Sequence, residues 1–208
     1  MNRKAAAHLS KVDRILARII RKVGPGDVPF PRGINPYETL VTAVAHQQLT
    51  GKAANTILGR VIALYPGKKF PTPEDLAATP DGKLRTAGFS RAKVAAVKDI
   101  AAKTIAGVVP KGRSLARMTD IEIIERLTSI RGVGPWTVEM LLIFSLGRPD
   151  VLPSTDFGVR KGFALTYKKK DLPSPKELLA FGERWKPHRS AAAWYLWRAT
   201  ELLRAKVK

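Results

Sequence analysis

Apolar residues recur every three or four positions along almost the whole of this 208-residue sequence. This period is typical of helices that bury one face, whereas half-buried strands alternate with a period of two. No convincing alternation of that kind is present, and stretches rich in proline and glycine, such as residues 23–33 and 65–75, interrupt the helical pattern. The sequence therefore predicts a compact all-α protein.

The expected helices are short and numerous, and the segments between them are typical of inter-helix loops rather than flexible linkers. With 45% hydrophobic residues the chain has enough apolar surface for one domain, or for two that pack closely. The helices are expected at residues 8–22, 36–49, 51–65, 73–78, 80–87, 90–106, 114–117, 120–128, 135–146, 156–166, 175–182 and 189–205.

The charge of the chain is strongly unbalanced. It has 37 Lys and Arg against 17 Asp and Glu, which gives a formal net charge of +20. Such an excess favours a polyanionic partner, because clustered Lys and Arg neutralise phosphates and release counterions. Nucleic acid is the first candidate and an anionic membrane surface the second. Since no amphipathic anchor or long apolar span supports the membrane, nucleic acid is favoured.

The sequence contains no cysteine. This excludes a disulfide framework, cysteine-ligated zinc, an iron–sulfur cluster and a thiolate nucleophile. The first 24 residues are basic, but Lys, Asp and Arg interrupt their apolar residues, so they predict an amphipathic helix rather than a signal peptide. We therefore expect a cytoplasmic protein.

The stretch IRGVGPWTVEMLLIF, residues 130–144, places two glycines and a proline directly ahead of an apolar helix. A helical pattern over residues 120–128 precedes it, so the segment predicts two helices joined by a tight hairpin. Amide groups at the start of the second helix would form a site for an anion such as phosphate. The alternative is a helical corner that binds nothing. The available amide donors are those of Gly132, Gly134, Trp136 and Thr137.

Two further segments carry residues that suit either packing or chemistry. The polar cluster Ser154-Thr155-Asp156 follows a proline and precedes a helix, which is typical of a helix N-cap, and capping does not exclude a catalytic role for the Asp156 carboxylate. Residues 181–199 contain three of the four tryptophans, with Trp194 and Trp197 three positions apart on one helix. Packing in the core is the simplest interpretation of these tryptophans.

Four motifs, taken in order, resemble a known family. LVTAVAHQQLTGKAANTI, LTSIRGVGPWTVEMLL, VLPSTDFGVRKGF and ERWKPHRSAAAWYLW are similar to the helix-hairpin-helix DNA glycosylases that have a Gly/Pro-rich loop and a catalytic aspartate. The likeness extends over about residues 36–200 and is greatest to the 3-methyladenine DNA glycosylase II group. It implies two helical subdomains with a substrate cleft between them. The terminal subdomain would combine residues 1–35 and 135–208, and the central one would be residues 36–134, ending in the hairpin.

The resemblance also implies roles for individual residues. Asp156 matches the aspartate that assists departure of the base, and Gln48 matches the wedge that fills the gap left by the extruded nucleotide. Gln47 is its neighbour near the groove, and His46 is an alternative for the wedge. The base pocket would include Trp136, Met140, Phe157 and Trp197; the DNA backbone would meet Gly132, Gly134 and Thr137; and the carbonyls of Thr128, Ile130 and Val133 would hold Na⁺ or K⁺.

The implied activity is hydrolysis of the N-glycosidic bond of alkylated bases, of the 3-methyladenine and 7-methylguanine type, after base flipping. The implied enzyme is a monomer that acts on double-stranded DNA, requires no cofactor and in a bacterium would be associated with the nucleoid. Lyase members carry a lysine where this chain has Trp136, so a monofunctional enzyme is expected. The sequence leaves no room for the additional β-rich domain that many relatives have. The alternative is a noncatalytic DNA-binding module, which would leave Asp156 and the tryptophans without a common purpose.

Overall fold

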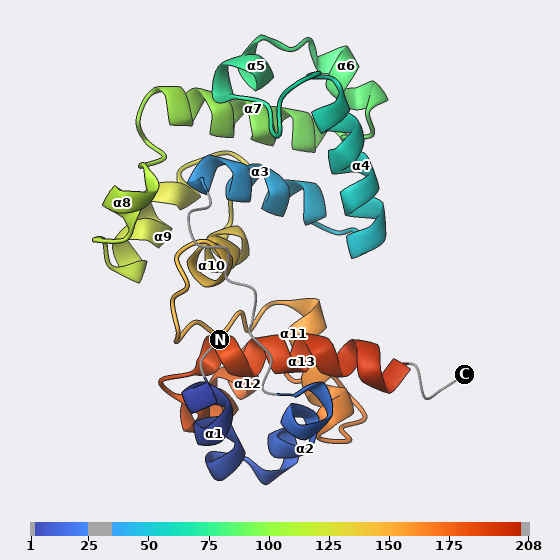
Figure 1. Cartoon of the computed structure of the whole chain (residues 1–208), viewed down its shortest axis with the longest axis vertical. Coiled ribbons are helices and arrows are strands. Elements are labelled where there is room, and N and C mark those ends of the chain that lie inside the picture. Colours follow the sequence, from blue (N-terminus) through green and yellow to red (C-terminus); the bar gives the residue numbers. More distant parts are fainter. Residues whose placement is uncertain (1–2, 25–34, 205–208) are drawn as a thin grey trace. The chain divides into compact units, whose positions relative to one another are not determined.

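The computed structural model describes residues 3–24 and 35–204 of the chain. All regular elements in these residues are helices, and no strand occurs among them (Figure 1). The all-α prediction is therefore confirmed. The chain divides into two compact units: unit 1 comprises Met1–Phe30 and Gly147–Lys208, and unit 2 comprises Pro31–Leu146.

Unit 2 is organised around one buried helix, α3, which packs against α4, α7 and α10. Leu40 and Val44 of α3 and Leu141 of α10 are completely buried, because the apolar positions of both helices face the same core. The helices of this unit are α3 (Pro36–His46), α4 (Gly51–Ala63), α5 (Pro73–Ala78), α6 (Asp81–Thr86), α7 (Arg91–Ile105), α8 (Gly112–Leu115), α9 (Asp120–Thr128) and α10 (Pro135–Phe144).

Unit 1 is organised around its last helix, α13, which packs against α11 and α2. Trp185 and Tyr195 are its largest fully buried side chains. Trp194 and Trp197 are partly buried against the same core, as the simplest interpretation of the tryptophans predicted. The helices of this unit are α1 (Arg3–Val12), α2 (Arg14–Val23), α11 (Phe157–Thr166), α12 (Pro175–Gly182), the 3-10 helix η1 (Glu183–Trp185) and α13 (Arg189–Arg204).

The single helix expected at residues 8–22 is in fact two helices, separated at Asp13. The Asp13 side chain caps α2, because its Oδ1 accepts hydrogen bonds from the amides of Ile15 (3.1 Å) and Leu16 (2.9 Å). Its Oδ2 accepts from the Tyr167 hydroxyl and from Nε1 of Trp185. Asp13 is thus a buried carboxylate that accepts hydrogen bonds from several donors. These hydrogen bonds, and not the apolar period of the sequence, determine where α1 ends and α2 begins.

Helices α11 and α13 cross at Gly162 with their backbones almost in contact. A Cβ atom added to Gly162 would lie 2.0 Å from the carbonyl oxygen of Leu196. Only a residue without a side chain fits at this crossing, and the crossing fixes how the start of α11 lies against α13.

The division into units differs from the expected one at α10. Residues 135–208 were expected in the terminal subdomain, whereas unit 2 continues to Leu146. The reason is packing, since α10 makes its contacts with α3 and α9. The proline- and glycine-rich stretch at 23–33 lies largely outside the described residues.

Candidate active site

The hairpin between α9 and α10 is held against α7. Gly132 has a φ of +75°, and a Cβ atom on it would lie 2.6 Å from Cβ of Ala96. The amide of Arg131 donates to Oδ2 of Asp99, also on α7, at 2.7 Å. Gly132 therefore serves both the turn and the close packing of the hairpin on its neighbour.

Gly134 has a different environment. It is the N-cap of α10, no side chain caps that helix, and a Cβ atom on Gly134 would meet nothing within 4 Å. Thr137, in contrast, is 1% exposed, and its amide donates to the Gly134 carbonyl at 2.9 Å. Thr137 is therefore committed to contacts inside the hairpin, so the expected contact of its amide with an anion is replaced by an internal hydrogen bond.

The three residues expected to hold a cation line one open hollow of about 730 Å³ on the hairpin. Residues 128–134 form most of its lining, and Asp99 and Lys103 complete it. The Ile130 carbonyl accepts a hydrogen bond from the Val133 amide at 3.0 Å, and a carbonyl oxygen has a second lone pair. Within the part of the chain that the structure describes, no cluster of three or more His, Asp or Glu side chains could hold a metal ion.

The loop between α3 and α4 is tied to the hairpin by Gln47. Its Nε2 donates to the Gly132 carbonyl at 2.9 Å and to Oγ1 of Thr137 at 3.1 Å. From α7, Nζ of Lys93 donates to the carbonyls of Ala45 and Gln47, at 2.8 Å and 3.0 Å. The end of α3 is thus fixed on two sides.

Gln48 follows this anchored residue and is exposed. Its φ is +56°, in the left-handed region that residues with a side chain rarely adopt. Leu49, which comes next, is also exposed, at 41%. The loop therefore presents two side chains from a fixed base, and the backbone at Gln48 is strained.

His46 lies on the other side of this loop, where it is half-buried and lines a pocket. Burial lowers its pKa, a hydrogen bond with Asn55 opposes this change, and the nearby Lys93 ammonium adds to the lowering. The imidazole is therefore uncharged at neutral pH. Its place in the pocket wall favours Gln48, not His46, as the wedge.

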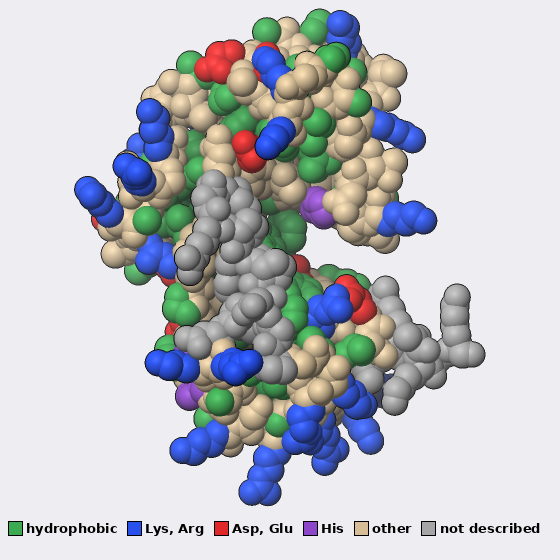
Figure 2. All heavy atoms as spheres, in the orientation of Figure 1, with side chains coloured by type: hydrophobic (Ala, Val, Ile, Leu, Met, Phe, Trp, Pro, Cys, Tyr) green, Lys and Arg blue, Asp and Glu red, His purple; other side chains and the backbone are tan. Residues whose placement is uncertain are grey.

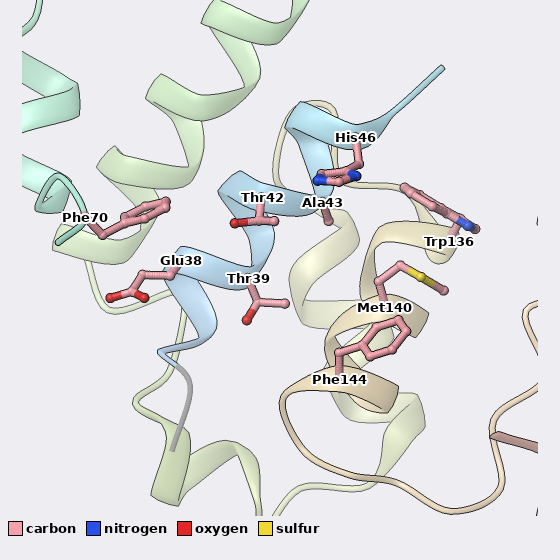
Figure 3. Close-up of a pocket in the computed structure, with 9 residues that line it drawn as sticks. All are labelled: Glu38, Thr39, Thr42, Ala43, His46, Phe70, Trp136, Met140 and Phe144. Atoms are coloured by element: carbon pink, nitrogen blue, oxygen red, sulfur yellow. The ribbon is translucent and has the colours of Figure 1, made fainter. Parts of the chain in front are cut away.

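The pocket has a volume of about 410 Å³ and lies between α3 and α10. Figure 3 shows residues of α3 on one side of it and three large side chains of α10 on the other. Two of these, Trp136 and Met140, were expected in a pocket. The third, Phe144, was missed, although it follows Met140 by one helical turn and lies on the same face. The lining residues are Glu38, Thr39, Thr42, Ala43, His46, Phe70, Trp136, Met140 and Phe144.

Asp156 caps α11 in unit 1, as its position after a proline predicted. Its Oδ1 accepts from the Val159 amide at 2.7 Å and from Nε1 of Trp197 at 2.8 Å. Gly158 permits this second contact, because a Cβ atom there would lie 2.8 Å from Cδ1 of Trp197. The carboxylate is therefore fixed at the positive end of a helix by one main-chain and one aromatic donor.

Phe157 follows this carboxylate and is 60% exposed. The ammonium of Lys161, one turn later, lies 5.7 Å from the centroid of its ring. Unit 1 thus carries Asp156, Phe157 and Trp197 of the predicted set, and unit 2 carries the hairpin, the α3–α4 loop with Gln48, and the pocket.

Residues 41–188, which contain the wedge loop, the hairpin and Asp156, match the family described as "HhH-GPD superfamily base excision DNA repair protein". The chain belongs to this superfamily. The glycosylase-like order of its motifs is thus explained by membership of the HhH-GPD superfamily, where HhH stands for helix-hairpin-helix.

Two relatives and one solved structure within this comparison are similar over nearly the whole chain. DNA-3-methyladenine glycosylase 1 of Schizosaccharomyces pombe is 42% identical over 202 residues, which are 96% of this chain and 88% of the relative. The alkylbase DNA glycosidase-like protein mag2 of the same organism is 31% identical, with 97% and 95% covered. The S. pombe 3-methyladenine DNA glycosylase Mag1 in complex with abasic DNA superposes with a TM-score of 0.91 at 42% identity, with 94% and 95% covered.

Among the helices formed by residues 3–24 and 35–204, none combines the length and the apolar character needed to cross a membrane.

Proposed function

We propose that this member of the HhH-GPD superfamily is a monofunctional DNA glycosylase that hydrolyses the N-glycosidic bond of alkylated bases in double-stranded DNA. The observation that carries this proposal is Asp156, whose carboxylate is fixed by Trp197 and Val159 at the start of α11. Its place in the sequence resembles that of the catalytic aspartate of such glycosylases. The relatives named 3-methyladenine glycosylases support the same class of substrate.

The base pocket suits a cationic purine. An enzyme of this kind must first take its target base out of the stack, at a cost of a few kcal/mol, and then hold it. Bases such as 3-methyladenine and 7-methylguanine carry a positive charge, so the face of Trp136 would attract them by about 0.5–2 kcal/mol. Because His46 is uncharged at neutral pH, the pocket wall does not oppose this attraction.

Asp156 would act on the sugar to which the base is attached. As the bond to the base breaks, the sugar becomes positively charged, and a carboxylate beside it lowers the energy of that state. The same group would orient or deprotonate the attacking water. The bonds from Val159 and Trp197 keep Oδ1 in place, so the carboxylate needs no reorganisation during the reaction.

The hairpin would bind the DNA backbone through the start of α10, where Gly134 leaves room for a phosphate. The carbonyls of Thr128, Ile130 and Val133 would hold a monovalent cation, because these residues line one hollow at the C-terminal, negative end of α9. Bound there, Na⁺ or K⁺ would supply positive charge next to that phosphate. The protein would otherwise require no cofactor and would act as a monomer wherever the cell keeps its DNA.

The proposal is tested by base release. Duplexes that each carry one lesion are incubated with excess protein, and free base is measured by chromatography in single turnover. We expect release of 3-methyladenine and 7-methylguanine, and no covalent complex with abasic DNA after borohydride treatment, since Trp136 cannot form a Schiff base. Binding of duplex DNA without release of any alkylated base would instead identify a noncatalytic module.

The wedge role of Gln48 gives a separate prediction. In Gln48→Gly the side chain is lost, yet glycine adopts the left-handed backbone without strain, so the fold should be as stable as the original or up to about 1 kcal/mol more stable. We expect less 2-aminopurine fluorescence next to the lesion, because the flipped base returns to the stack more easily.

Gln48→Ala removes the side chain beyond Cβ and keeps the backbone strain, and is the matched control for this prediction. Both variants should lose flipping to a similar extent and differ only in thermal stability. Undiminished flipping in both would assign the wedge to Leu49 or another residue of the loop.

A further inference from the structure

The exposed face of α2 is almost entirely basic. Its exposed residues are four Lys and Arg and one apolar residue, Ile15. The basic residues are spaced by four, three and one positions, so they form one stripe along the helix. None of them forms an ion pair with any residue in 3–24 or 35–204. The four residues are Arg14, Arg18, Arg21 and Lys22.

A second basic segment meets this stripe. The three consecutive lysines at 168–170 are exposed and directly follow Tyr167. The Tyr167 hydroxyl donates to Asp13, the residue before Arg14, so the beginning of the stripe and the lysine segment lie beside each other. Arg184 belongs to the same region, since its guanidinium stacks at 3.8 Å on Phe181, whose ring contacts Tyr167.

Few acidic groups offset these charges. Asp171 follows the lysine segment, and Glu177 is engaged in the capping box of α12, where it accepts from the Ser174 amide at 2.7 Å. Figure 2 shows blue side chains gathered over the end of unit 1 that carries α1 and α2. We call the surface formed by the α2 stripe and residues 168–170 the α2 basic surface.

The α2 basic surface and Asp156 are separated by the length of α11. Asp156 caps the first residue of this helix, and residues 168–170 follow its last turn. Ten residues of α-helix span about 15 Å, and the two ends point in opposite directions. A duplex that delivers a base to Asp156 would meet the N-terminal end of α11, whereas the lysines lie beyond its C-terminal end.

We propose that the α2 basic surface binds a second segment of duplex DNA while the active site holds the first. Its chemistry is phosphate neutralisation by seven cations, which is independent of sequence. An anionic membrane is the poorer partner, because a helix that lies in a membrane surface needs an apolar face. The apolar residues of α2, such as Leu16, Ile19 and Ile20, are buried in unit 1.

Two duplexes test this inference. One carries an uncleavable abasic analogue and is immobilised, saturated with the full-length protein and washed free of excess protein. A fluorescent undamaged duplex is then titrated onto the complex at several salt concentrations. We expect the complex to capture it, with an affinity that falls steeply with salt. The triple variant Arg18→Gln, Lys168→Gln, Lys169→Gln should capture it about tenfold more weakly, with a salt slope smaller by about 2–3.

The matched control removes three exposed cations from unit 2: Lys69→Gln, Lys83→Gln, Arg85→Gln. It carries the same net charge as the first triple variant and should capture the second duplex like the original protein. Equal losses in the two variants would show that total charge, and not this surface, holds the DNA. Failure of the original complex to capture a second duplex at low salt would overturn the inference outright. Base release is not read in this experiment, so its result is independent of the proposed catalytic activity.

Discussion

Replacing Asp156 with Asn should lower the single-turnover rate of base release by about 10²–10³ while the protein remains folded. The amide retains an oxygen that can accept from the Val159 amide and from Trp197, the two donors that hold the carboxylate at 2.7 Å and 2.8 Å. Asn is also about as good an N-cap as Asp. The variant therefore removes the negative charge and little else.

The measurement compares release of 7-methylguanine, the melting temperature and the affinity for lesion-containing duplex. Asp171→Asn is the matched control, since it removes an exposed carboxylate from the same unit and should react at the original rate. Asp156→Asn should melt near the original temperature and still bind DNA. An unchanged rate in this variant would reduce Asp156 to a helix cap and remove the basis for the catalytic proposal.

The second large effect concerns stability, and two glycine substitutions should act in opposite directions. Gly162→Ala should destabilise the fold by about 3 kcal/mol, because its Cβ would lie 2.0 Å from a backbone oxygen of α13, which no side-chain rotation relieves. Gly59→Ala, in an exposed position of α4 where a Cβ meets nothing within 4 Å, should stabilise it by about 1 kcal/mol.

Urea denaturation followed by circular dichroism measures both changes. The rate of base release by Gly162→Ala under native conditions is a second measurement. It reports the position of α11, because displacement of α11 also displaces Asp156 from Trp197. We expect its rate of base release to fall even where the protein is fully folded. If both alanine variants were more stable than the original, the close crossing of α11 and α13 would be refuted.

Most helices could be predicted because their apolar period and their start and stop residues agree. Residues 120–128 and 175–182 were predicted with the observed bounds, and both helices begin with a capping box. The break at Asp13 was not predicted. Besides its local capping bonds, Asp13 accepts from Tyr167, just after α11, and from Trp185 of η1, which are distant in sequence. The sequence pattern around residue 13 does not reveal contacts with such distant residues.

The candidate site likewise contains residues that the sequence motifs predicted and others that only the folded structure reveals. The motifs identified Trp136, Met140 and Asp156, but the role of a neighbour depends on where its atoms point. Thr137 is part of the hairpin motif, yet it is buried and bonded inside the hairpin. Lys93, which holds the end of the wedge loop, belongs to none of the four motifs and becomes visible only when α7 is packed beside α3.

The two hydrogen bonds of Gln47 join elements that are 85 and 90 residues away in the chain. Through this one side-chain amide, the loop that carries Gln48 and the hairpin that would bind a phosphate form one connected unit. Binding of a DNA backbone by the hairpin would therefore also bring this loop toward the duplex. Under the proposed roles, recognition of the backbone and probing of the base stack would be coupled, and a duplex that opens easily would be selected before any base reaches the pocket.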